Sequence, residues 1–256
     1  ALALLFSISI IFNLETDRGD ASVPTETVST PFQQVSLGAR AAYVYDVRTQ
    51  KVLFAKNENA RLPLASLAKV MSALVAEYTS PLYGVVTIDE EALKADGDSG
   101  LVVNEKWSLS NLLDFSLVTS SNDGMRAIAL ALGALSKAEA TPEEIVGDFV
   151  KEMNHKANKL GLNSTYFWNE TGLDLPTEEG SEVMKGGAYG TAKDMSTLME
   201  YILTSYPELF NATKEIQTII ESADNHPHIA KNTNIIASEV PGLLASKTGF
   251  TETAGG

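Results

Sequence analysis

Residues 63–71 read Pro63-Leu64-Ala65-Ser66-Leu67-Ala68-Lys69-Val70-Met71, and this stretch decides how the chain folds. A loop that contains Pro63 leads into a helix that starts at Ser66. Apolar residues then recur at three- and four-residue spacing, as on one face of a helix: Leu67, Val70, Met71, Leu74 and Val75. A helix with so apolar a face is expected to lie in the centre of the domain.

The same stretch places a serine and a lysine one helical turn apart. Residues at positions i and i+3 share a face, so the side chains of Ser66 and Lys69 are expected to meet. A serine hydroxyl becomes a good nucleophile when a base takes its proton, and a lysine acts as that base when burial or a second cation destabilises its ammonium. Alone the motif is weak, because roughly one S-x-x-K is expected by chance in such a chain.

A second polar motif, Ser120-Ser121-Asn122, lies between two segments with helical spacing. The Asn122 amide offers a donor and an acceptor, which suits the amide groups of a peptide substrate. Ser121 or Asn122 also fits the N-cap of the following helix. Both interpretations hold together if Asn122 faces the site and a neighbour caps the helix.

A third motif, Lys247-Thr248-Gly249, falls on a predicted strand over residues 244–250. Lys247 would place a fixed positive charge beside Lys69, which keeps Lys69 neutral and attracts a substrate carboxylate. Thr248 adds a hydroxyl, and Gly249 permits a close approach of the backbone.

The three motifs occur in the order S-x-x-K, S-x-N, K-T-G. They carry a family resemblance together with four further stretches: Tyr45-Asp46, residues 119–124 (TSSNDG), Gly172-Leu173-Asp174 and residues 246–255 (SKTGFTETAG). The chain resembles the serine-type D-alanyl-D-alanine carboxypeptidases, which are low-molecular-mass penicillin-binding proteins. The resemblance covers about residues 39–256.

The resemblance implies a role for each motif residue. Ser66 forms the acyl-enzyme, Lys69 takes its proton, and Ser120 helps to pass a proton to the departing D-alanine. Asn122 holds the stem peptide. The substrate carboxylate binds Lys247 and Thr248, and the backbone N–H groups of Ser66 and Phe250 form the oxyanion hole. The implied partners are peptidoglycan stem peptides that end in D-Ala-D-Ala, with β-lactam antibiotics as covalent inhibitors; no metal and no cofactor is expected.

Hydrophobic periodicity predicts an α/β (α+β) domain with strands towards both ends of the chain and an inserted helical lobe at about residues 90–205. The resemblance implies that this domain is of the β-lactamase/DD-peptidase type, with a mostly antiparallel sheet flanked by helices. Strands are expected at residues 42–47, 51–55, 85–88 and 244–250, and a hairpin within residues 101–107. Helices are expected from 66, from 108 or 110 to 117, and over 122–135, 141–160 and 192–205. The family's sheet continues beyond its K-T-G strand, so we expect further strands after Gly256 and low stability without them.

Composition bounds the compartment and the partners. Apolar residues make up 44% of the 256 residues, as in a globular domain, and the net charge of −14 argues against nucleic acid. Residues 1–14 are uncharged and suit a signal or anchor segment, and residues 15–38 suit a polar linker before a catalytic domain at 39–256. We therefore expect an exported enzyme at the outer face of the cell membrane or in the periplasmic or cell-wall space, attached to the membrane through the N-terminal segment.

Four alternatives remain open at this point. A DD-endopeptidase that cuts cross-links uses the same nucleophile, and a catalytically silent peptidoglycan-binding relative keeps the same fold. A class A β-lactamase needs a glutamate for deacylation, but Glu170 in Asn169-Glu170-Thr171-Gly172 is interpreted as a surface acid. A zinc peptidase is suggested only by Asp224, His226 and His228, which are interpreted as a polar loop.

Overall fold

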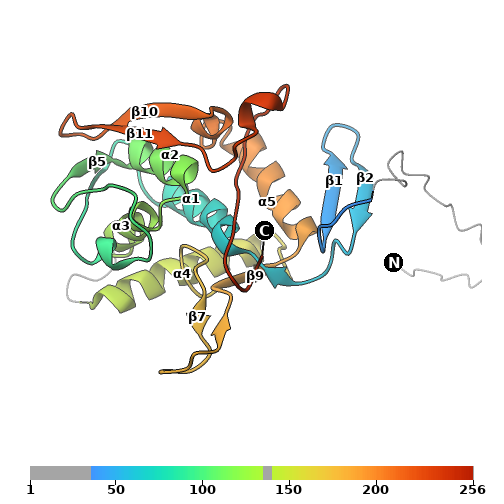
Figure 1. The fold of residues 1–256 in the computed structure, drawn as a ribbon, viewed down its shortest axis with the longest axis horizontal. Coiled ribbons are helices and arrows are strands. Elements are labelled where there is room, and N and C mark those ends of the chain that lie inside the picture. The colour runs from blue at the N-terminus through green and yellow to red at the C-terminus, as the bar shows by residue number, and fades with distance from the viewer. Residues whose placement is uncertain (1–35, 135–139, 256) are drawn as a thin grey trace, which may run out of the picture.

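The computed structural model describes residues 36–134 and 140–255 (Figure 1). Its helices are α1 Ala68–Thr79, α2 Leu109–Thr119, α3 Asn122–Gly133, α4 Pro142–Lys159 and α5 Ala192–Ser205, with short 3₁₀ turns η1 Ala65–Leu67, η2 Ala92–Lys94, η4 Asn211–Lys214 and η5 Ala237–Glu239. Its strands are β1 Ala42–Asp46, β2 Lys51–Lys56, β3 Leu62–Pro63, β4 Val85–Thr87, β5 Lys106–Ser108, β6 Tyr166–Phe167, β7 Leu175–Pro176, β8 Met184–Lys185, β9 Ala188–Gly190, β10 Gln217–Glu221 and β11 Pro227–Lys231.

Helix α1 lies at the centre of the molecule, as its apolar sequence predicts. It contacts α2, α3, α4 and α5, and its residues from Ala68 to Ala76 are all buried. The apolar face that includes Met71 and Leu74 joins a continuous core with Trp107 and Phe115. Burial of apolar side chains contributes about 25 cal/mol for each Å² removed from water, so this core is the main source of stability.

The predicted starts of α2, α3, α4 and α5 are confirmed by side-chain caps. Ser108 caps α2, Ser121 caps α3 and Thr191 caps α5, each accepting a hydrogen bond from a backbone N–H of the first turn. Thr141 and Glu144 form a capping box at the start of α4, which ends before Gly161 at a φ of +73°.

All named strand pairs are antiparallel, as predicted, and the 42–47/51–55 hairpin is confirmed as β1–β2. Within the described residues, however, the strands form separate small sheets rather than one sheet. The hairpin expected within residues 101–107 is wrong. β5 pairs instead with β4, with Val86 opposite Trp107, because this register buries both side chains against the core.

The strand expected at 244–250 is also not formed. Residues 243–250 run as an extended segment without ladder pairing to any strand of the described residues, and side chains fix it instead. The Ser246 N–H donates to Thr213 Oγ1 (3.0 Å) and the Ser246 hydroxyl donates to the Thr213 carbonyl (2.8 Å). Figure 1 shows this red segment crossing the molecule toward β9.

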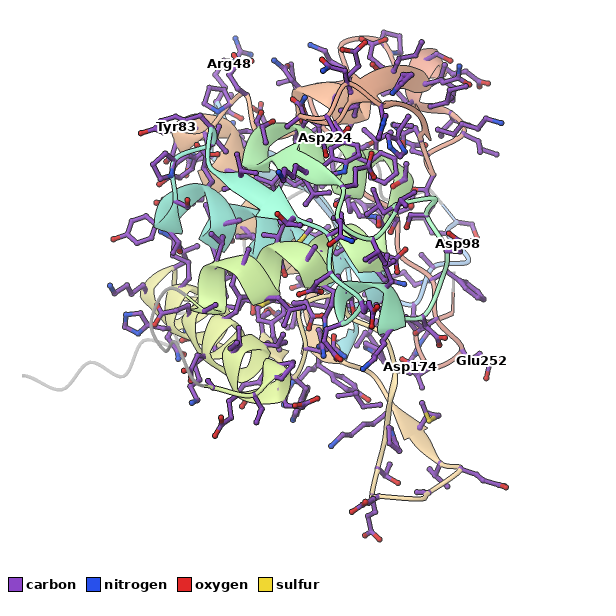
Figure 2. The ribbon with its side chains drawn as sticks, turned by 90° about the vertical axis from the view of Figure 1, so that its left-hand side faces the viewer. Arg48, Tyr83, Asp98, Asp174, Asp224 and Glu252 are labelled. Carbon is purple, nitrogen blue, oxygen red and sulfur yellow. The ribbon has the colours of Figure 1, made fainter. Side chains whose placement is uncertain are left out.

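The predicted signal or anchor segment (1–14) and most of the predicted linker (15–38) lie outside the described residues, and the domain division stays a prediction. Across residues 36–134 and 140–255, no helix reaches the length and mean hydropathy that crossing a bilayer requires. Figure 2 shows that the β7–β8 hairpin, which follows Asp174, projects away from the body of the molecule.

Candidate active site

Ser66 sits in the 3₁₀ turn η1, directly before α1, rather than in the first turn of an α-helix as predicted. The preceding Ala65 is buried and adopts a left-handed backbone conformation with a φ of +47°, which turns the chain sharply from β3 into η1. Positions i and i+3 eclipse each other in a 3₁₀ turn. Ser66 and Lys69 meet across the junction of η1 and α1, with Lys69 Nζ 2.9 Å from Ser66 Oγ.

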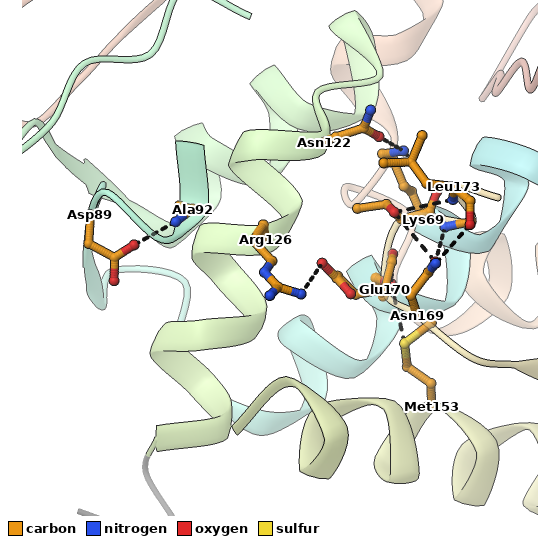
Figure 3. Close-up of polar contacts among 12 residues, drawn as sticks. Lys69, Asp89, Ala92, Asn122, Arg126, Met153, Asn169, Glu170 and Leu173 are labelled. Atoms are coloured by element: carbon orange, nitrogen blue, oxygen red, sulfur yellow. Dashed lines mark hydrogen bonds and ion pairs between the residues drawn. The ribbon is translucent and has the colours of Figure 1, made fainter. Parts of the chain in front are cut away.

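Lys69 is completely buried and its amine contacts three oxygen atoms, of which Figure 3 shows the one on Asn122. The Nζ atom lies 2.9 Å from Ser66 Oγ, 2.6 Å from Asn122 Oδ1 and 2.9 Å from the carbonyl oxygen of Thr171. Two of these oxygen atoms, on Asn122 and Thr171, are obligate acceptors. Only the Ser66 hydroxyl is able either to accept or to donate.

This set of partners defines how a neutral Lys69 would be oriented. A neutral amine carries two hydrogen atoms and one lone pair. If Asn122 and Thr171 take the two hydrogens, the lone pair faces the Ser66 hydroxyl, which is the contact that a general base needs.

The electrostatic surroundings favour that neutral form. Burial first, and the charge of Lys247 second, lower the pKa of Lys69 from its ordinary value of 10.5 to about 7, while Glu170 opposes both. A substantial fraction of Lys69 is thus uncharged near neutral pH.

The Ser120-Ser121-Asn122 motif forms the break between α2 and α3. Ser120 ends α2 in a left-handed conformation with a φ of +60°, and the Ser121 hydroxyl accepts from the N–H of Gly124. Asn122 Nδ2 donates to the carbonyl of Asp96 (2.6 Å), which turns its Oδ1 toward Lys69. Both interpretations of the motif are confirmed: Ser121 caps the helix while Asn122 faces the site.

Lys247 lies on the other side of Ser120. Its Nζ is 2.8 Å from Ser120 Oγ and 2.7 Å from the carbonyl oxygen of Thr248. Burial lowers the pKa of Lys247 to about 8. Each amine therefore contacts one serine hydroxyl, Ser66 for Lys69 and Ser120 for Lys247, and the charge of Lys247 helps to lower the pKa of Lys69.

At Gly249 the extended segment 243–250 passes close to the turn that holds Ser66. A Cβ at Gly249 would lie 3.0 Å from the Leu64 carbonyl oxygen and 3.1 Å from the Ser66 backbone nitrogen, so the close approach expected of this glycine is confirmed. Thr248 Oγ1 donates to Thr233 Oγ1 (2.6 Å), and the Phe250 side chain is 71% exposed.

The sequence interpretation misses the loop 169–172, which closes the site behind α1. Thr171 binds Lys69 through its backbone carbonyl, and a backbone acceptor leaves no trace in the residue types. The interpretation of Glu170 as a surface acid is wrong, because this residue is 2% exposed. The signal for the turn is Gly172, which has a φ of +80° and packs directly on Ala65.

The residues that suggested zinc lie elsewhere. His228 Nε2 is 2.6 Å from Glu105 Oε1, His226 Nδ1 is 3.7 Å from the same oxygen, and Asp224 accepts from the N–H of Lys106. In the part of the chain that the structure describes, no group of three His, Cys, Asp or Glu side chains is arranged to hold a metal ion.

Comparisons with known proteins agree with this geometry. A D-alanyl-D-alanine endopeptidase from Pseudomonas aeruginosa is 28% identical over 98% of this chain and 76% of its own length. D-alanyl-D-alanine carboxypeptidase DacF from Bacillus subtilis is 29% identical over 83% of this chain, which spans about half (51%) of that relative.

Among solved structures, penicillin-binding protein D2 from Listeria monocytogenes, in its ampicillin-bound form, superposes with a TM-score of 0.67. The two are 27% identical, and the match covers 86% of this chain and 82% of that one. The predicted DD-peptidase-like fold class is thereby confirmed.

The sequence profile of one family, described as D-alanyl-D-alanine carboxypeptidase (Peptidase_S11), matches residues 25–256. This match includes all three motifs and nearly the whole of the described chain. The chain therefore belongs to the D-alanyl-D-alanine carboxypeptidase family of serine hydrolases.

Proposed function

We propose that this protein removes the terminal D-alanine from peptidoglycan stem peptides through an acyl-enzyme on Ser66. One observation carries the proposal: Lys69 Nζ lies 2.9 Å from Ser66 Oγ, while its other hydrogen-bonding positions are occupied by Asn122 and Thr171. This arrangement supports proton transfer from the hydroxyl to the amine and the formation of a nucleophilic oxygen.

In the proposed acylation step, Ser66 Oγ attacks the carbonyl carbon of the penultimate D-alanine while its proton passes to Lys69. The resulting tetrahedral oxyanion is placed against the backbone N–H groups of Ser66 and Phe250. The C–N bond then breaks, and the departing amine receives a proton by way of Ser120. Water subsequently cleaves the Ser66 ester and restores the hydroxyl.

The remaining motif residues are proposed to bind substrate. Lys247 and Thr248 bind the terminal carboxylate, because the lysine ammonium and the neighbouring threonine hydroxyl both donate hydrogen bonds to carboxylate oxygens. Asn122 Nδ2 is proposed to exchange its contact with Asp96 for the stem peptide backbone. The same geometry supports β-lactam antibiotics as covalent inhibitors, because these also acylate a serine.

The decisive experiment measures release of D-alanine from a peptide that ends in D-Ala-D-Ala. We expect Ser66→Ala to lower the rate by at least about 10³-fold and to abolish labelling by a fluorescent penicillin. A Ser66→Ala protein that keeps its thermal unfolding temperature and still releases D-alanine at the original rate contradicts the proposal.

A second candidate activity is endopeptidase cleavage of D-alanyl cross-links. The similarity to the endopeptidase from Pseudomonas aeruginosa over 98% of the chain favours it. The two activities share Ser66 and differ in the leaving group, which is free D-alanine in one and a cross-linked peptide in the other. Parallel assays with a pentapeptide and a cross-linked dimer of the same stem peptide distinguish them by their kcat/KM ratio.

We further propose that the enzyme acts on the outer side of the cell membrane, in the periplasmic or cell-wall space, because its substrate is peptidoglycan. The uncharged segment 1–14 is proposed to direct export or to attach the protein to the membrane. Fractionation of cells that produce the full chain, with and without residues 1–14, tests this. Equal recovery of both forms in the cytoplasm contradicts it.

A further inference from the structure

Glu170 is a buried acid in the loop that contacts the reactive lysine, and the three motifs do not explain it. Its Oε1 lies 3.4 Å from Nη1 of Arg126 on α3, whose side chain is 24% exposed. Its Oε2 is enclosed and has no hydrogen-bond partner among the described residues. Leaving a buried carboxylate oxygen without a partner costs stability, so this position calls for an explanation.

A cavity of about 320 Å³ adjoins this ion pair. Charged residues line much of it: Lys94, Asp96, Arg126, Glu170 and Asp174. The same cavity borders Thr171, whose carbonyl binds Lys69. The loop 169–172 thus lines this cavity through Glu170 and Thr171 and contacts the reactive amine through Thr171.

The backbone of Glu170 is fixed independently of its side chain. Its carbonyl accepts a 2.6 Å hydrogen bond from the Ser72 hydroxyl, one turn of α1 after Lys69 (Figure 3). The next carbonyl, that of Thr171, accepts from Lys69 itself. Two successive carbonyls thus clamp the loop onto α1, and the Glu170 side chain turns away from them toward Arg126.

We propose that Glu170, held by Arg126, is a positioning residue for acyl transfer, whose carboxylate stabilises the positive charge that Lys69 acquires when it takes the Ser66 proton. This inference rests on the proposed function, since it requires Lys69 to act as the base. Glu170 touches neither substrate nor the reacting atoms.

The physical need for such a group follows from the rest of the site. Burial and the charge of Lys247 both favour neutral Lys69, and Glu170 acts against them on its pKa. A base kept neutral by surroundings that strongly oppose its charged form would accept a proton poorly. A carboxylate at a fixed position offsets that opposition when the charge develops, without any reorganisation.

The charged groups around Lys69 and Glu170 come from several neighbouring segments. Lys247 belongs to the extended segment 243–250, Glu170 to the loop 169–172 and Arg126 to α3. Lys94 and Asp174 lie on the wall of the cavity. Of these, only Glu170 is both negative and nine-tenths buried.

The test is the pH dependence of acylation by a fluorescent penicillin, measured as a second-order rate so that it reports on the free enzyme. In this pH–rate profile the acidic limb is the low-pH side, where protonation of Lys69 lowers the rate. We expect Glu170→Gln, which keeps the size of the side chain, to move this limb to lower pH by about 0.5–1 unit. The rate above the limb is expected to fall roughly 3- to 10-fold, because the charged form of Lys69 has lost its counter-charge.

Two further variants complete the test. Arg126→Gln removes the opposite charge, so its acidic limb is expected to move to higher pH. Glu179→Gln, an exposed acid on the β7–β8 hairpin, is the matched control and is expected to leave the profile unchanged. Thermal unfolding of each variant shows that it is folded.

The outcomes separate the two hypotheses. If the wild-type protein is not acylated at any pH, the proposed function fails. If it is acylated but the Glu170→Gln limb coincides with the wild-type limb or moves to higher pH, this inference is overturned and the proposed function stands. If Glu170→Gln does not fold, the Arg126→Gln variant decides. An acidic limb of Arg126→Gln that does not move to higher pH then overturns the inference about Glu170.

Discussion

Ala65 and Ser120 adopt left-handed backbone conformations although neither is glycine, and each stands at a motif residue of the site. Ala65 precedes the nucleophile, and Ser120 ends α2 beside Lys247. Such conformations cost about 1–2 kcal/mol for an L-residue and persist only where the surroundings enforce them. For Ala65 the enforcing neighbour is Gly172, whose α-carbon faces the Ala65 carbonyl.

We expect Gly172→Ala to destabilise the protein and to impair acylation. A Cβ at Gly172 would lie 1.8 Å from the Ala65 carbonyl oxygen and 3.0 Å from the Ala68 Cβ, so either the loop or the turn that holds Ser66 must move. The backbone conformation and the overlap together should lower the unfolding free energy by roughly 2–4 kcal/mol. Urea unfolding and the rate of penicillin labelling measure the two effects.

Gly180→Ala is the matched control for this change. Gly180 has a similar φ, +76° against +80° at Gly172, but a Cβ at Gly180 would meet no atom within 4 Å on the exposed hairpin. It should cost about 1–2 kcal/mol at most, with unchanged acylation. Equal losses at both glycines would show that backbone conformation alone matters and that packing against Ala65 does not.

At the scale of single elements, the start of α4 depends on the Thr141 capping box. The Thr141 hydroxyl accepts from the N–H of Glu144, and the Glu144 carboxylate accepts from the N–H of Thr141. This start is placed against the end of α3, where a Cβ at Gly133 would lie 2.3 Å from the Ile145 carbonyl oxygen. The cap therefore fixes where two helices cross.

We expect Thr141→Ala to lower the unfolding free energy by about 1 kcal/mol, because the backbone N–H of Glu144 loses its side-chain acceptor. Thr141→Ser keeps the hydroxyl and is expected to retain most of the stability. Penicillin acylation should be unaffected in both, since α4 contributes no polar contact to the reactive groups. A Thr141→Ala protein as stable as the wild type in urea would contradict this account.

The helices were predictable from the sequence because their signals are local. Thr141-Pro142-Glu143-Glu144 marks a helix start through capping and charge, and the α1 stripe marks a buried face. The three motifs were likewise readable, because each places its chemistry on side chains. The family resemblance that they carry implied that Lys69, Ser120 and Lys247 belong to one site; Lys247 contacts Ser120, and its charge acts on Lys69.

The parts that sequence reasoning missed depend on long-range contacts. The extended segment at 243–250 is held by Thr213, more than thirty residues earlier, rather than by the strand pairing that its apolar residues suggested. Burial of Glu170 depends on Arg126, 44 positions away, and nothing near Glu170 in the sequence indicates it. The β4–β5 pairing likewise joins segments on opposite sides of a long loop.

Across the whole molecule, the site places a buried amine, Lys69, and a half-buried amine, Lys247, inside a protein whose net charge is −14. Long-range attraction to the acidic surface does little for these amines, because burial dominates the pKa of both Lys69 and Lys247. The last described residues are anchored on the loop that follows Gly172. Thr253 Oγ1 donates to Asp174 Oδ1 (2.5 Å), and the Thr253 N–H donates to Asp174 Oδ2 (3.1 Å).

Buried amines of this kind make stability depend on pH in a direction that can be worked out. In the folded protein the pKa of Lys69 is about 7, against an ordinary value of 10.5 in the unfolded chain. Between these values the unfolded chain binds more protons than the folded one, so the unfolding free energy contributed by Lys69 rises with pH. Below about pH 6 both states are protonated and the contribution is constant.

Lys69→Met tests this linkage because it removes the titrating group while keeping an unbranched side chain of similar length. The loss of hydrogen bonds to Asn122 and Thr171 gives an offset that should not depend on pH. The slope is therefore the informative quantity. The unfolding free energy of the wild type minus that of Lys69→Met is expected to rise by up to about 1.4 kcal/mol per pH unit between pH 7 and 10.5.

Guanidinium unfolding at about pH 6, 8 and 9.5 measures this difference. The control is Lys159→Met, which replaces an exposed lysine at the end of α4 and should show a constant difference from the wild type. A difference between wild type and Lys69→Met that stays flat over this range would mean that Lys69 is charged in the folded protein throughout, and the neutral amine facing Ser66 would then have to be abandoned.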